Sequence, residues 1–176
     1  SLMMLSMVFV MITLATESAQ RIAEVLGETS SLTSPPQAVT EVRDGSVDFD
    51  GVSFKYAKTA KRMALSNIDL HIRSGETIGI IGGTGSGKST LINLIPRFYE
   101  ATKGAVLVDG VNVKEYPFEQ LRTQIGLVPQ KATLFSGTIR ENLQWRKENA
   151  TDEEIARALS IAQASEFVDA LPEKYD

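Results

Sequence analysis

The sequence has no cysteine and only one histidine, His71. Disulfide bonds, thiolate zinc sites, thiol nucleophiles and sites with several histidine ligands are therefore excluded. The chain also lacks an excess of basic residues, because its formal net charge is -4, and we expect no nucleic-acid partner. Internal repeats and low-complexity tracts are absent too. What remains is an ordinary globular composition with 43% hydrophobic residues, enough for a sizeable core.

The N-terminal residues form a nearly unbroken apolar run. It covers residues 2–15 and is interrupted only by Ser6 and Thr13. As a helix this run would be about 21 Å long, whereas the apolar core of a bilayer is about 30 Å thick. We interpret it as the later part of a membrane-spanning helix that starts before Ser1. A signal peptide is disfavoured because no basic segment precedes the run, and a buried or interface helix of a soluble domain remains open.

Composition divides the chain into three parts. Residues 1–27 are expected to be the end of a transmembrane helix with its amphipathic, cytoplasmic extension, and a glycine is the natural stop. Residues 28–44 are rich in serine and contain two adjacent prolines, which is the composition of a linker. Residues 45–176 begin a domain in which short strand and helix patterns alternate, as in the α/β class.

Strand and helix patterns within this domain are specific enough to place its elements. Two short runs of alternating apolar residues flank the turn signal Asp50-Gly51, which predicts two paired strands around a turn. The segment 106–113 suggests a hairpin around Asp109-Gly110. The β-branched run 77–81 is typical of a central buried strand. We also predict strands at 63–72 and 125–128, and helices at 88–95, 118–124, 139–145 and 151–171, the last opening with the capping box Thr151-Asp152-Glu153-Glu154.

A glycine-rich segment follows the predicted buried strand and leads into a predicted helix. It reads Gly82-Gly83-Thr84-Gly85-Ser86-Gly87-Lys88-Ser89 and meets the pattern G-x4-G-K-[ST] in full. The glycines let the backbone turn its N–H groups inward around phosphate oxygens. Lys88 supplies a mobile cation to the β- and γ-phosphates, and the hydroxyl of Ser89 is a ligand for Mg²⁺. The segment therefore predicts a P-loop that binds ATP with Mg²⁺.

Further motifs on both sides of the P-loop resemble the nucleotide-binding domain of ABC transporters. The resemblance is to the exporter type, in which membrane helices and ATPase share one polypeptide. It implies a P-loop NTPase fold of the ABC type, incomplete here, with an antiparallel β subdomain and a preceding N-terminal helix. The motifs are the strand-like segments 47–56 and 65–70, then Lys103-Gly104 and Val108-Asp109-Gly110, then Ile125-Gly126-Leu127-Val128-Pro129-Gln130 and the segment 134–143.

The resemblance also implies roles for residues outside the P-loop. Tyr56 corresponds to an aromatic residue that stacks on adenine, although strand packing alone would also explain it, and Thr90 completes the nucleotide-binding set 82–90. Gln130 corresponds to the Q-loop glutamine, which contacts Mg²⁺ or the attacking water, so Ser89 and Gln130 are the expected metal ligands. Without the resemblance, Gln130 would be a solvated loop residue. The implied partners are ATP, a membrane domain of the same polypeptide and a second nucleotide-binding domain in a homodimer or heterodimer. The implied location is the cell membrane.

The sequence departs from the family pattern because it contains no signature motif, Walker B strand or histidine loop. Asp109 follows an apolar run, but Gly110 stands where the catalytic glutamate would be, so we interpret the pair as a hairpin turn. We expect a fragment of a longer exporter, truncated before the signature motif and Walker B, with little or no ATPase activity and with exposed apolar edges. Two alternatives stay open: a soluble ABC-type ATPase of DNA repair or translation, and a non-catalytic nucleotide-binding module.

Overall fold

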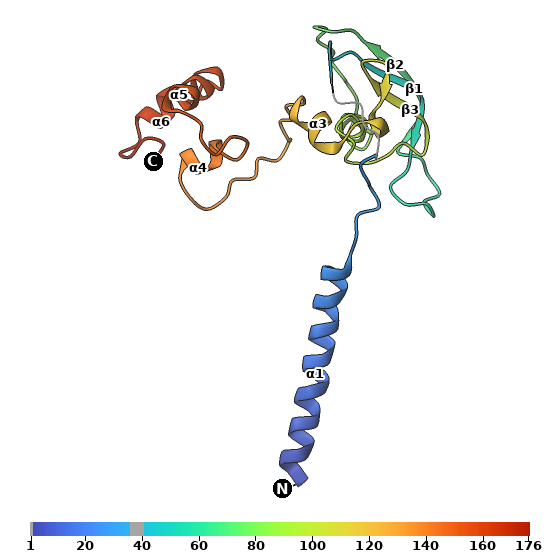
Figure 1. The fold of residues 1–176 in the computed structure, drawn as a ribbon, viewed down its shortest axis with the longest axis vertical. Helices are drawn as coiled ribbons and strands as arrows, with labels where there is room; N and C mark the ends of the chain where they lie inside the picture. Colours follow the sequence, from blue (N-terminus) through green and yellow to red (C-terminus); the bar gives the residue numbers. More distant parts are fainter. Residues whose placement is uncertain (1, 36–40) are drawn as a thin grey trace. The chain divides into compact units, whose positions relative to one another are not determined.

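The computed structural model describes residues 2–35 and 41–176, which belong to two compact units, Ser1–Gly126 and Leu127–Asp176 (Figure 1). Pro36 and Gln37 of the predicted linker lie outside the described residues. The first unit contains α1 (Leu2–Gly27), β1 (Val47–Phe54), β2 (Leu65–Ile72), α2 (Lys88–Leu94), β3 (Lys103–Val108), β4 (Val111–Asn112), the 3₁₀ helix η1 (Val113–Glu115) and α3 (Phe118–Thr123). The second contains α4 (Ile139–Leu143), α5 (Asp152–Ile161) and α6 (Ser165–Asp169).

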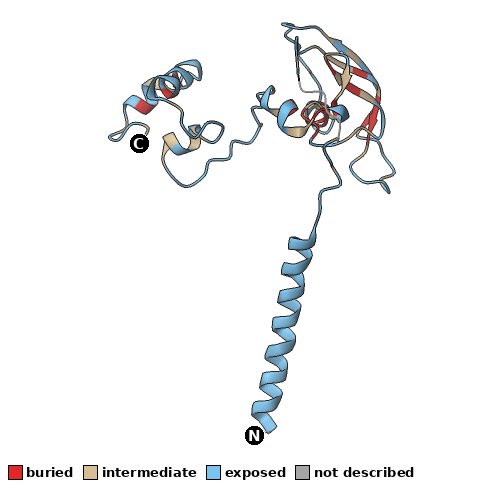
Figure 2. Cartoon of the chain, in the orientation of Figure 1, coloured by how far each residue is buried: buried red, intermediate tan, exposed pale blue. Residues whose placement is uncertain are grey.

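Helix α1 is long and apolar enough to cross a membrane. It has 26 residues and buries none of them against the rest of the chain, as its uniform colour in Figure 2 shows. The hydroxyls of Ser6, Thr13 and Thr16 donate to backbone carbonyls four residues earlier, at 3.1, 2.9 and 2.8 Å. Because these polar groups are satisfied within the helix, they need no water, which suits a surrounding of lipid.

Strand β1 lies at the centre of an antiparallel sheet with the order β2-β1-β3-β4. The sequence predicted two short strands around a turn at Asp50-Gly51, and this prediction was wrong. One continuous strand passes through these residues, with register shifts against both neighbours. Pairing with β2 on one side and β3 on the other holds the chain extended, and the positive φ of Gly51, 55°, absorbs the irregularity as a bulge.

Asp109 and Gly110 form the predicted hairpin turn between β3 and β4. Their φ values are 53° and 72°, the left-handed conformation that a two-residue hairpin loop requires. The Asp109 carboxylate accepts hydrogen bonds from the backbone amides of Arg43, Asp44 and Gly45, the last two at 3.3 and 2.6 Å. Asp109 therefore attaches the segment before β1 to the sheet, and its interpretation as a turn residue is confirmed.

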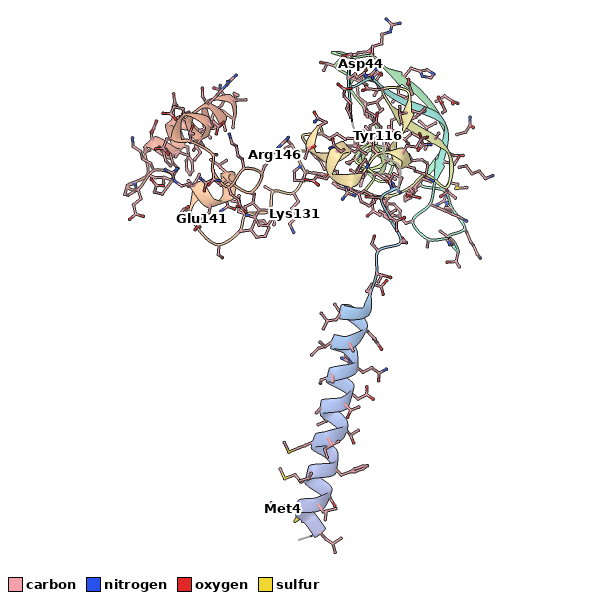
Figure 3. The ribbon with its side chains drawn as sticks, viewed as in Figure 1. Met4, Asp44, Tyr116, Lys131, Glu141 and Arg146 are labelled. Atoms are coloured by element: carbon pink, nitrogen blue, oxygen red, sulfur yellow. The ribbon has the colours of Figure 1, made fainter. Side chains whose placement is uncertain are left out.

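The core of the first unit lies between the sheet and the short helices that follow the P-loop (Figure 2). Tyr116, labelled in Figure 3, is fully buried, and its hydroxyl donates to the carbonyl oxygen of Val108 at 3.1 Å. Burial of each large apolar side chain contributes about 1.5–3 kcal/mol. The buried set comprises Phe49, Val52, Phe54, Leu65, Leu91, Leu94, Val106, Val108, Val113, Tyr116 and Leu121.

Two predicted strands are not formed. Residues 77–81 and 125–128 have no regular secondary structure, and Ile81 and Val128 are 99% and 94% exposed. A buried strand requires hydrogen-bonded neighbours on its edges. Among the described residues, none pairs with either segment, so their apolar side chains alone do not make them strands.

The second unit packs α5 and α6 together around Ile155, Leu159 and Val168. The capping box at the start of α5 is confirmed, because Thr151 and Glu154 exchange side-chain to backbone hydrogen bonds. A single helix over 151–171 was predicted, but the helix breaks at Gln163, whose φ is 56°. This turn brings Val168 back against the apolar face of α5, which a continuous helix would not allow.

Candidate nucleotide-binding site

The P-loop residues form a tight turn that ends where α2 begins at Lys88. Two of its glycines have positive φ, 79° at Gly85 and 94° at Gly87, which is the N-cap of α2. Other residues adopt this conformation only with strain. The turn is exposed from Gly82 to Ser86, and within it the Ser86 amide donates to the Gly83 carbonyl oxygen at 3.3 Å. Successive backbone N–H groups in glycine-rich turns of this kind bind phosphate oxygens.

Glycine is needed at Gly87 for a second reason, namely close contact. A Cβ on Gly87 would lie 2.8 Å from both the Ala64 carbonyl oxygen and Leu65 Cδ2, at the start of β2. A Cβ on Gly82 would lie 2.7 Å from Ser86 Oγ, a side-chain atom that can rotate away. Close contact with backbone therefore excludes a side chain at Gly87.

The side chain of Lys88 lies inside the turn. Its Nζ donates to the carbonyl oxygens of Gly82 and Gly83 at 2.7 and 2.9 Å, and to Ser86 Oγ at 3.4 Å. An ammonium group has three donors and a long flexible stem, so it can exchange these neutral acceptors for phosphate oxygens with little movement. Hydrogen bonds to a charged acceptor are stronger, and that exchange favours an anion.

Ser89 and Thr90 occupy the first turn of α2 with different exposure. Ser89 is exposed, whereas Thr90 is only 5% exposed. A serine hydroxyl is a hard oxygen ligand of the kind that Mg²⁺ accepts, usually with phosphate oxygens and water completing the shell. Within residues 2–35 and 41–176, no group of three or more acidic, histidine or cysteine side chains is arranged so that it could hold a metal ion. The chemistry of Ser89 therefore fits an ion that arrives with a phosphate ligand.

Tyr56 contacts α2, the helix that follows the P-loop. Its hydroxyl lies 2.8 Å from Thr90 Oγ1, although 34 residues separate the two in sequence. The ring remains 60% exposed and, with linker residues 28–32 and residues 98–102, lines a cavity of about 770 Å³. The structure thus places Tyr56 and residues 82–90 in one unit, joined by the contact between Tyr56 and Thr90.

Gln130 belongs to the second unit, where it is exposed in an irregular segment. The residues after it are ordered by Asn142, whose side chain accepts from the Phe135 amide at 2.9 Å and donates to the Phe135 carbonyl at 3.0 Å. The rings of Phe135 and Trp145 stack with centroids 4.0 Å apart. Helix α4 begins with a second capping box, in which Thr138 is the N-cap. Lys131, the neighbour of Gln130, and Glu141 of α4 are labelled in Figure 3.

Sequence reasoning missed Arg97, which is only 4% exposed and joins the linker to the end of α2. Its guanidinium donates to Glu100 Oε1 at 2.5 Å and to the Thr33 carbonyl oxygen at 3.0 Å, and it stacks over Phe118. Burial alone would raise the pKa of Glu100, but the hydrogen bond from Arg97 and the positive charges of Lys114 and Arg97 lower it below the ordinary value. The aromatic and charged run after Pro96 was the available signal, because such a run is unusual for a plain connecting loop.

A glycine-rich loop that leads into a helix, a lysine hydrogen-bonded within that loop and an aromatic ring beside the helix are the features of a P-loop nucleotide-binding domain. The profile of the ABC transporter family matches residues 65–175, and the chain belongs to this family. The antiparallel β subdomain and the N-terminal helix that the resemblance implied are both present.

The names of similar proteins support the assignment to this family. A multidrug export ATP-binding/permease protein of Staphylococcus aureus (strain NCTC 8325 / PS 47) is 47% identical over 136 residues, which cover 77% of this chain and 23% of the relative. The uncharacterized ABC transporter ATP-binding protein YfiB of Bacillus subtilis (strain 168) is 43% identical over all 176 residues and 30% of its own length. A bacterial Atm1-family ABC exporter, solved with ATP bound, matches with a TM-score of 0.82 and 30% identity, over 98% of this chain and 30% of that one. The chain thus spans less than a third of these proteins.

Proposed function

We propose that the chain is the ATP-binding portion of an ABC exporter whose whole protein couples ATP binding and hydrolysis to transport across a membrane. The observation that carries the proposal is a P-loop with an enclosed lysine in the same chain as an apolar 26-residue helix. In this proposal residues 1–27 end a transmembrane helix, residues 28–44 link it to the ATPase, and residues 45–176 begin the ATP-binding domain on the cytoplasmic side.

Different residues of the site are proposed to bind different parts of the nucleotide. The amides of residues 83–90 and the ammonium of Lys88 hold the β- and γ-phosphates, and Ser89 provides one oxygen to Mg²⁺. Mg²⁺ supplies charge neutralisation at the phosphates when it is bound. Tyr56 stacks on the adenine, a contact that contributes about 1–3 kcal/mol. Gln130 is assigned to the metal or to the attacking water, because its amide both donates and accepts hydrogen bonds.

Hydrolysis and transport belong to the whole protein. Residues 1–176 contain no Asp-Glu pair after an apolar strand to serve as the second metal ligand and general base, so we expect this chain alone to bind ATP but to hydrolyse it very slowly. The proposed partners are the membrane domain of the same polypeptide and a second nucleotide-binding domain. A soluble ABC ATPase is disfavoured, because α1 is apolar and two of the relatives described above are named as export proteins.

The proposal is tested by nucleotide binding to the 176-residue chain in detergent. Lys88→Ala should weaken MgATP binding at least about tenfold, because it removes charge-assisted hydrogen bonds to the phosphates. Lys61→Ala is the matched control, since Lys61 is an exposed lysine of the loop before β2 and outside the P-loop. Calorimetric titration gives both affinities. Equal affinities of the two variants would show that Lys88 does not bind the nucleotide.

A further inference from the structure

The ring of Tyr56 is held on three sides by residues from different parts of the first unit. Its hydroxyl is hydrogen-bonded to Thr90 at 2.8 Å. Its centroid lies 4.9 Å from that of Phe54 with an angle of 81° between the rings, and 5.1 Å from that of Tyr99 with an angle of 87°. Such edge-to-face pairs are favourable geometries for aromatic rings. Tyr56 therefore has one preferred orientation, although it follows the end of β1 on a loop.

Two of the three residues that contact Tyr56 are buried. Phe54 is 4% exposed in the core at the end of β1, and Thr90 is 5% exposed in the first turn of α2. Tyr99 follows α2 and also contacts Phe54, with centroids 5.5 Å apart, so the three rings form one closed group. The backbone at this point is fixed by the buried guanidinium of Arg97, two residues earlier. Tyr99 is thus an anchored support and not a free surface residue.

The same ring remains accessible to a ligand. Tyr56 is 60% exposed and Tyr99 is 41% exposed, and both line the cavity of about 770 Å³, a volume that accommodates a small molecule. Because the ring is already fixed in orientation and open to solvent, it loses little conformational entropy when a planar base stacks on it. Because Thr90 is adjacent to Ser89, the fixed ring also stands at a set position relative to the phosphate site.

We propose that Tyr99 is a positioning residue for the base of the nucleotide and acts through the ring of Tyr56, an inference that rests on the proposed function. Removal of the Tyr99 ring frees Tyr56 to rotate and weakens base stacking without touching the phosphate contacts. The Tyr99 hydroxyl takes no part in the ring pair, so phenylalanine at this position preserves the effect. The Tyr56 hydroxyl contributes separately through its bond to Thr90.

The test compares a ligand that has a base with one that lacks it. Magnesium tripolyphosphate occupies the phosphate site alone, so the ratio of its dissociation constant to that of MgATP isolates the contribution of the nucleoside. For Tyr99→Leu we expect MgATP binding to weaken about five- to tenfold while tripolyphosphate binding stays unchanged, and Tyr99→Phe should retain the wild-type ratio. Tyr56→Phe keeps the ring but loses the bond to Thr90, and it should show a smaller loss of the same kind.

Each other outcome has a defined meaning. Equal weakening of both ligands by Tyr99→Leu, or an unchanged ratio with Tyr99→Leu, would overturn the positioning role while leaving ATP binding intact. If Tyr99→Leu does not fold, Tyr99→Met, which also removes the ring, decides by the same ratio. A wild-type chain that binds neither ligand would overturn the proposed function itself.

Discussion

Gly104 lies where β3 passes the bulge of β1, and it shows how one residue type is dictated by its neighbours. Its φ is 75°, and a Cβ would lie 2.5 Å from the carbonyl oxygen of Gly51. Gly110 has nearly the same φ, 72°, but no atom lies within 4 Å of a Cβ there. A side chain at Gly104 would therefore cause both backbone strain and a steric clash, whereas a side chain at Gly110 would cause backbone strain alone.

We predict that Gly104→Ala destabilises the sheet by roughly 2–5 kcal/mol, the sum of left-handed strain and overpacking, and that Gly110→Ala costs only about 1–2 kcal/mol from strain. Amide hydrogen exchange in β1 and β3 measures both changes as local opening free energies. Equal effects of the two substitutions would show that the packing of β3 against the β1 bulge is wrong.

His71 gives a second prediction for a single residue. Its Nδ1 lies 2.8 Å from Asp48 Oδ1, and this hydrogen bond raises the pKa of His71 above the ordinary value near 6.5. The resulting contribution to stability is fully present below pH about 6.5 and is lost as the pH rises through the raised value. NMR titration follows one imidazole without ambiguity, since His71 is the only histidine. Asp48→Asn should lower the titration midpoint, and an unchanged midpoint would exclude this ion pair.

Helix α1 carries the prediction that belongs to single elements. Phe9 lies in its apolar half and Gln20 in its polar half. Phe9→Arg should raise the free energy of membrane insertion by about 3 kcal/mol, whereas Gln20→Arg should change it little. Extraction of membranes with alkaline carbonate measures the embedded fraction. If Phe9→Arg remains embedded as fully as the wild type, or the wild type itself is extracted, α1 is not a membrane segment.

Elements fixed by local sequence were predicted well. The Asp109-Gly110 hairpin, the start of α2 at Lys88 and the capping box at Thr151 each depend on backbone conformations or hydrogen bonds within a few residues. The P-loop belongs to the same group, because its glycines and its lysine are adjacent in the chain. Such features can be found in a sequence without knowledge of the rest of the fold.

Elements that depend on distant partners were predicted poorly. The apolar run 77–81 matches a buried strand, but a strand forms only where other strands pair with it. The turn at Asp50-Gly51 failed for the opposite reason, since pairing with β2 and β3 overrode a strong local turn signal. Tyr99 and Arg97 escaped notice because their roles arise from contacts with Tyr56 and Thr33 that no local pattern reveals.

At the scale of the whole molecule, residues of both units are assigned to the proposed activity. The phosphate-binding residues 82–90 and Tyr56 lie in the first unit, and Gln130 lies in the second. Transport and hydrolysis are proposed for the whole protein. The residues that match this chain cover only 23% and 30% of the length of the two curated relatives. Binding of the triphosphate is the one step that residues 1–176 should perform alone, and the whole account depends on it.

Hydrogen exchange at the P-loop amides tests that step most directly. When MgATP is added to the 176-residue chain in detergent, the amides of residues 83–90 should exchange more slowly, because they donate to phosphate oxygens. AMP, which lacks the β- and γ-phosphates, should give much weaker protection and serves as the control. Protection by MgATP that is confined to residues 83–90 and their contacts is the predicted result. Unchanged exchange in this segment at saturating MgATP would contradict the assignment of the P-loop as the nucleotide site.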